Sequence, residues 1–100
     1  MEAMFYHNLP AALGDVFRAP AGTSVQQLAR VAAERLEAIE NDSERSLAGR
    51  TVLNFILGRV DNGQKDVVER ALAVMDRFPH FPRPRAEVAR RALHMLGEAG

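Results

Sequence analysis

The side chains best suited to acid–base or metal chemistry are three histidines and a run of acids near the middle of the chain. Imidazole and carboxylate groups bind metal ions and transfer protons near neutral pH. The histidines, His7, His80 and His94, are widely separated, and none belongs to an H-x-x-x-H or E-x-x-H pattern of the kind that forms a helical metal site. We therefore predict no metal site and expect these histidines to be structural or solvated.

The acidic run is dense enough to raise the question of catalysis by paired carboxylates. Such pairs catalyse proton transfer only where burial or a neighbouring charge separates their pKa values. Here the acids lie on the polar side of a predicted helix and in the loop after it, which favours a solvated face. No serine lies in a G-x-S-x-G motif, and no glycine-rich phosphate loop is present. The sequence predicts neither an enzyme nor a cofactor. The acids are Glu34, Glu37, Glu40, Asp42 and Glu44.

Positive charge is concentrated in the segment Arg77–Arg91, which holds five arginines against a single acid, Glu87. Phe78 and Phe81 are interleaved with the arginines, and a helix that starts after a basic loop can contact phosphates. The segment Ala86–Gly100 resembles the helix that precedes the wing in winged-helix DNA binders. As an alternative function, the segment predicts a nucleic-acid-binding regulator. Its anion contacts would be Arg77, Arg83, Arg85, Arg90 and Arg91.

Aromatic residues suggest a different class of function, the binding of another protein. Three prolines predict a stiff, extended connector over residues 79–84, on which Phe78 and Phe81 are presented to a partner. Alternatively, the two rings fold back over the core. A short leader, residues 1–8, adds Phe5 and Tyr6. Because four short helices do not easily cover this many large apolar groups, we predict an interaction module (adaptor, chaperone-like or regulatory subunit) that forms a homodimer through the leader and the central helix.

The composition is that of one globular domain spanning residues 1–100, with 47% hydrophobic and 26% charged residues. Thirteen basic residues balance thirteen acids, which argues against the strongly basic surface of many nucleic-acid binders. The absence of cysteine excludes a disulfide framework. Neither a signal peptide nor a membrane-spanning run is recognisable, so we expect a cytoplasmic protein. The preference for Arg over Lys and the abundance of Ala are typical of GC-rich bacterial genomes.

Apolar residues recur at three-and-four spacing along most of the chain, which predicts an all-α fold. The fold would be a compact bundle of four main helices plus a short N-terminal helix. Ser24 and Gln27 match a capping box at the start of the first main helix. The predicted helices are Leu9–Phe17, Val25–Glu40, Glu44–Val60, Gln64–Phe78 and Pro84–Leu96.

The segment Leu47–Val60 is the most apolar of the chain, with large side chains on nearly every side of a helix. Such a helix needs cover on several sides, which predicts that the bundle packs around it. Asn54 would be hydrogen-bonded within the core or, alternatively, would set the register at a dimer seam. Gly49 and Gly58 would permit close helix contacts. Thr51–Leu57 alone could be a strand, but the chain offers no partner strand. The residues expected to be most buried are Leu53, Phe55, Ile56 and Leu57.

Overall fold

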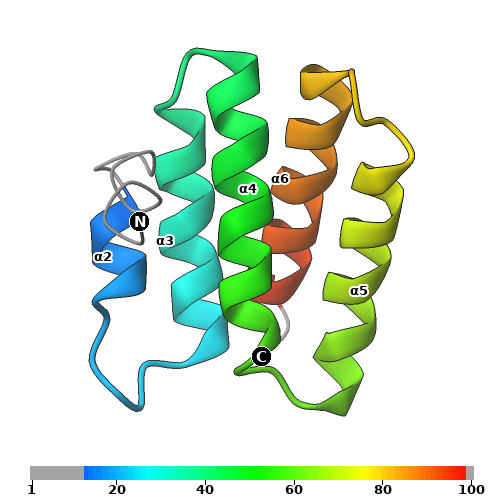
Figure 1. The fold of residues 1–100 in the computed structure, drawn as a ribbon. Helices are drawn as coiled ribbons and strands as arrows, with labels where there is room; N and C mark the ends of the chain where they lie inside the picture. Colours follow the sequence, from blue (N-terminus) through cyan, green and yellow to red (C-terminus); the bar gives the residue numbers. More distant parts are fainter. Residues whose placement is uncertain (1–12, 99–100) are drawn as a thin grey trace, which may run out of the picture.

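The computed structural model describes residues 13–98, and helix is the only regular secondary structure in that range. The four long helices run alternately up and down and form one bundle (Figure 1). This confirms the predicted all-α fold, and Thr51–Leu57 is helical. The predicted leader, with Phe5 and Tyr6, lies outside the described residues. The helices are α2 (Gly14–Phe17), α3 (Val25–Glu37), α4 (Asp42–Leu57), α5 (Asn62–Asp76) and α6 (Pro82–Glu98).

Three of the long helices begin at a side chain that caps their first turn. Ser24, Asn41 and Asp61 each accept a hydrogen bond from the backbone N–H three residues later, at 3.1, 2.9 and 3.0 Å. These oxygens satisfy N–H groups that have no partner within the helix. The local sequence therefore fixes where α3, α4 and α5 start, and the cap predicted at Ser24 is confirmed.

The fourth long helix begins earlier than predicted, because two prolines of the supposed connector lie inside it. Pro82 and Pro84 belong to the first turn of α6. Proline fits there because its fixed φ suits a helix and because the first N–H groups of a helix have no internal acceptor. The prediction of an extended connector over residues 79–84 is thus wrong. The link between α5 and α6 is a short turn over residues 77–81.

Helices α4 and α6 run parallel and lie against each other, although α5 separates them in the sequence (Figure 1). A Cβ atom built on Gly49 would lie 2.6 Å from the Cβ of Ala89. This distance is well below the usual separation of nonbonded carbons, so only glycine fits. The close approach predicted at Gly49 is confirmed. At Gly58 the same prediction is wrong, because this residue is exposed at the C-terminal end of α4.

The bundle does not pack around α4 alone. Helix α6 packs against α3, α4 and α5, and α4 packs against α3, α5 and α6, so these two helices share the centre of the bundle. One face of α4 remains open to solvent. Leu47 is 50% exposed, and Asn54, two turns later, is exposed as well. The predicted core position of Asn54 is therefore wrong, and α4 is not covered on all sides.

Burial within α4 agrees only in part with the prediction. Leu53 and Ile56 are fully buried, whereas Phe55 and Leu57 are half-buried. Phe55 lies at the edge of the core, where its ring meets that of Phe17 edge-on, with centroids 5.1 Å apart. The guanidinium of Arg59 lies 4.1 Å from the centroid of the Phe55 ring. Phe55 therefore joins α2 to α4 at the rim of the core. None of the helices within residues 13–98 is long and apolar enough to cross a membrane.

Candidate interaction surface

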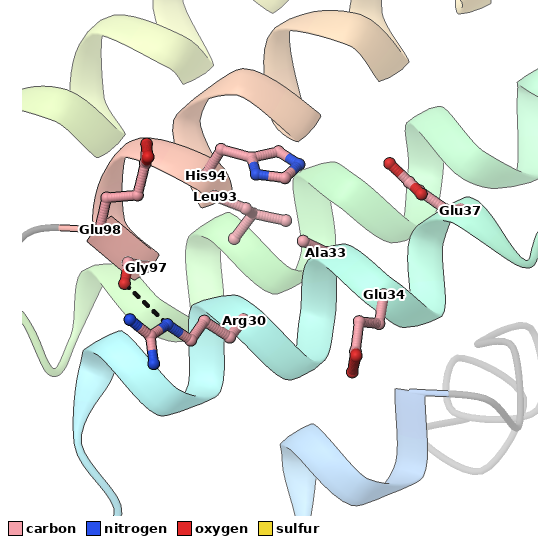
Figure 2. A pocket seen from close by; sticks show the side chains of 8 residues that line it. All are labelled: Arg30, Ala33, Glu34, Glu37, Leu93, His94, Gly97 and Glu98. Carbon is pink, nitrogen blue, oxygen red and sulfur yellow. Dashed lines mark hydrogen bonds between the residues drawn. The ribbon is translucent and has the colours of Figure 1, made fainter.

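A pocket of about 330 Å³ between α3 and α6 collects several of the chemistry-bearing side chains (Figure 2). The imidazole of His94 lies near its centre, and the Nε of Arg30 donates to the carbonyl oxygen of Gly97 at 2.9 Å. The carboxylates around the pocket point in different directions, and no three His, Asp or Glu side chains of residues 13–98 are placed to hold a metal ion. The pocket thus lacks converging carboxylates. These acids are Glu34, Glu37 and Glu98.

The clearest pKa shift in the described part of the chain belongs to an exposed ion pair of α6. Arg90 donates to both carboxylate oxygens of Glu87, at 2.7 and 3.2 Å. This hydrogen bonding and the positive charge of Arg90 lower the pKa of the Glu87 carboxyl, and Glu87 in turn raises the pKa of Arg90. A carboxyl with a lowered pKa is a poor general acid at neutral pH. The pair is therefore better explained as a surface ion pair within α6 than as a catalytic group.

The five arginines of the predicted basic region do not lie on one face of the bundle. Arg83 and Arg90 line a pocket that also touches α3 and α4, whereas Arg91 lines a groove between α5 and α6. Arg85 donates to a backbone carbonyl oxygen near the end of α5. Arg77 is exposed and forms no ion pair within residues 13–98.

Several of these arginines are already engaged by acids of the same chain. The Nε of Arg83 lies 3.4 Å from a carboxylate oxygen of Asp42 on α4. Arg90 and Arg91 both approach Glu87, with closest distances of 2.7 and 3.9 Å. Intramolecular partners neutralise much of the local charge, so the field that this region offers to a phosphate backbone is weaker than the sequence suggests.

An apolar surface follows the hairpin of α5 and α6 along its outer side. We call it the α5–α6 face; its residues are Val67, Val74, Phe78, Phe81, Val88 and Met95. Four of them line a groove of about 430 Å³ between the two helices. The exposed fractions are 37% for Val74, 38% for Phe78, 58% for Phe81 and 57% for Met95.

Helical spacing aligns the apolar residues that each helix contributes to the groove. On α6, Val88 and Met95 lie seven residues apart, which places them on one side of the helix, and Phe81 immediately precedes the helix. On α5, Val67 and Val74 share the same interval, and Phe78 lies in the turn after the helix. Phe78 and Phe81 are exposed in the turn that joins the two helices, outside the residues that line the groove.

Charged residues border the α5–α6 face. Asp66 and Arg70 of α5 line the groove and form an ion pair at 3.1 Å. Arg91 of α6 lines the opposite side. Arg77 lies seven residues beyond Arg70 and thus on the same side of α5. An apolar centre with a charged border is the usual anatomy of a protein–protein interface.

Of the partner-binding residues predicted from the sequence, Phe78 and Phe81 lie on this surface, and the rings do not fold back over the core. Val74 and Met95 were not recognised. Val67 and Val88 were not recognised either, and both are only half-buried. The seven-residue spacing was the available indication, but the same spacing also marks core positions.

Comparisons with protein-family models, with curated proteins and with solved structures give no match for this chain.

Proposed function

We propose that this protein is a small cytoplasmic protein-interaction module that binds its partner through the α5–α6 face and performs no catalysis. The observation that carries the proposal is the exposure of several large apolar side chains on one hairpin, in the groove between its helices and in its turn. Scattered exposed apolar residues are normal on any protein surface, whereas contiguous ones usually mark a binding site.

The extent of the surface supports this function. With about 200 Å² for a phenylalanine side chain, the exposed fractions of Phe78 and Phe81 correspond to about 80 and 120 Å². Val74 and Met95 bring the apolar area to the order of 400 Å². The largest patch on a soluble monomer is typically about 300–600 Å² and is often functional.

The shape of the surface also suits a protein partner. A groove between two helices accepts an apolar helix, whose side chains enter at three-and-four spacing. Met95, which lines the groove, and Phe81, in the turn that joins the two helices, provide flexible or aromatic anchors of the type found at interfaces. The second candidate, nucleic-acid binding, has less support, because the arginines face different sides and most are paired with groups of the chain itself.

Site-specific photo-crosslinking in the native host tests the proposal. A benzophenone amino acid replaces Phe81 in one variant and Leu47 in the matched control. Leu47 is also an exposed apolar residue, 50% accessible, but it lies on the outer face of α4. We expect a discrete protein adduct from position 81 and none from position 47. Equal labelling at both positions, or no adduct at position 81, would contradict binding through the α5–α6 face.

A further inference from the structure

We propose that the partner of the α5–α6 face is a second copy of the same chain, related by a two-fold axis perpendicular to the helices. In this dimer Asp66 of each copy faces the partner's Arg77. The inference rests on the proposed function and identifies the partner for that same surface. Three features of the molecule support it: the area of the surface, the order of charges along its border and the net charge of the chain.

The exposed area agrees with what a small dimer requires. A standard interface buries about 800 Å² on each partner, and roughly 56–65% of that area is apolar. The apolar share is therefore about 450–520 Å² per copy. The four most exposed residues of the α5–α6 face supply most of it, and the half-buried Val67 and Val88 add the remainder. The face is thus large enough to close one isologous interface.

The charges along the border of α5 determine how two copies can meet. Asp66 and Arg77 lie eleven residues apart on the same side of α5, hence about 16 Å apart along its axis. With a two-fold axis parallel to the helices, Asp66 of one copy would lie at the same height as Asp66 of the other, and Arg77 at the same height as Arg77. A two-fold axis perpendicular to them brings the acidic end of one copy to the basic end of the other. Opposite charges then meet twice, since an isologous interface repeats every contact.

Arg77 is available for such a contact. It is exposed, and within residues 13–98 no acid lies within ion-pair distance of it. Asp66 pairs with Arg70, but both side chains are largely exposed, at 65% and 80%. Such an exposed pair is weak and leaves the second carboxylate oxygen free to accept from another cation.

The balance of charge removes the usual obstacle to self-association. The chain has a formal net charge of zero at pH 7. Identical copies of a strongly charged protein repel one another, whereas proteins near zero net charge associate readily. No general repulsion therefore opposes the contact of two α5–α6 faces.

Sedimentation equilibrium of the purified full chain tests the dimer. We expect self-association at micromolar concentration. Met95→Arg, which places a charge in the groove, should weaken the association at least tenfold, because a buried unpaired charge is costly. Leu47→Arg is the matched control on α4 and should leave the dissociation constant unchanged. Circular dichroism confirms that each variant remains folded.

Charge reversal tests the arrangement of the two copies. Asp66→Arg and Arg77→Asp should each weaken the dimer on the order of tenfold, because each creates two like-charge contacts. The double variant D66R/R77D should restore the affinity to within about threefold of wild type. Restoration by the double variant requires that the two positions meet across the interface, because within one chain they are too far apart to pair.

The opposing results are also distinct. A chain that remains monomeric at millimolar concentration would overturn the inference, and an adduct at position 81 with a different protein would still support the proposed function. The inference would also be overturned if Leu47→Arg disrupted the dimer and Met95→Arg left it intact. A double reversal that stays as weak as the single ones would refute the perpendicular two-fold arrangement.

Discussion

Replacing Gly49 by Ala should destabilise this fold, although alanine favours a helix over glycine by about 1 kcal/mol. The added Cβ would lie 2.6 Å from the Cβ of Ala89, whereas nonbonded carbons rest about 3.5–4.0 Å apart. Neither carbon can rotate away, because each is bonded directly to the backbone of a long helix. Helices α4 and α6 must therefore separate by about 1 Å, which loosens the core side chains between them.

The magnitude follows from two opposing terms. Overpacking a well-filled contact costs about 1–3 kcal/mol, and the gain in helix propensity offsets about 1 kcal/mol. We expect a net loss of up to about 2 kcal/mol in the free energy of unfolding. For a domain of this size, each kcal/mol lowers Tm by about 4–8 °C, which thermal unfolding followed by circular dichroism resolves. In the double variant G49A/A89G the contact is relieved and the propensity terms cancel, so Tm should return close to wild type.

Gly58 offers a matched control on the same helix. The nearest atom to a Cβ built there is the carbonyl oxygen of Phe55 at 3.9 Å, and its φ of −75° suits any residue. Gly58→Ala should therefore stabilise the protein by about 0.4–1 kcal/mol through the unfolded state. If G58A behaves in this way while G49A is as stable as wild type, the close contact between α4 and α6 is refuted.

Three further variants test the packing, the helix caps and the surface ion pair. Phe55→Ala should cost about 2 kcal/mol by chemical denaturation, less than the 3–5 of a fully buried phenylalanine, because the ring is half-buried against Phe17; a cost above about 4 kcal/mol would show that burial has been underestimated. Asp61→Ala should lower the free energy of unfolding by about 1 kcal/mol, since the first turn of α5 loses its cap. Asp61→Asn retains the acceptor oxygen and should therefore be about as stable as the wild type. The pKa of Glu87 is lowered in the folded chain by Arg90, so its contribution to stability is present above the ordinary pKa and is lost as pH falls through the lowered one. Glu87→Gln should flatten that part of the stability–pH curve, and an unchanged curve would contradict the pairing.

The helix pattern could be predicted because its determinants are local. Ser24 sits three residues before the amide it caps, and apolar residues recur at the period of a helix, so that both can be recognised along the chain. The same local rule explains the error at the start of α6. The prediction placed Pro82 in an extended connector and began the helix at Pro84, yet both prolines occupy the first turn, where proline is tolerated.

The degree of burial could not be predicted equally well, because it depends on which neighbours a helix meets. Phe55 and Asn54 are adjacent in the most apolar segment of the chain, yet one is half-buried and the other exposed. Their positions relative to α2 and α6 decide this difference, and no local pattern specifies them. The α5–α6 face could not be recognised from the sequence for the same reason. Val67 and Val88 occupy positions that would be inward in a helix surrounded on all sides.

The close contact at Gly49 and the exposed α5–α6 face are two consequences of one packing choice. Because α4 and α6 approach each other directly, α5 lies at the edge of the bundle and packs against them on one side only (Figure 1). That side buries Val68, Ala71 and Met75. The next stripe of α5 is covered only in part, so its valines line an open groove with the neighbouring stripe of α6. A bundle stabilised by a tight pair of parallel helices thus leaves the final hairpin with exposed apolar surface.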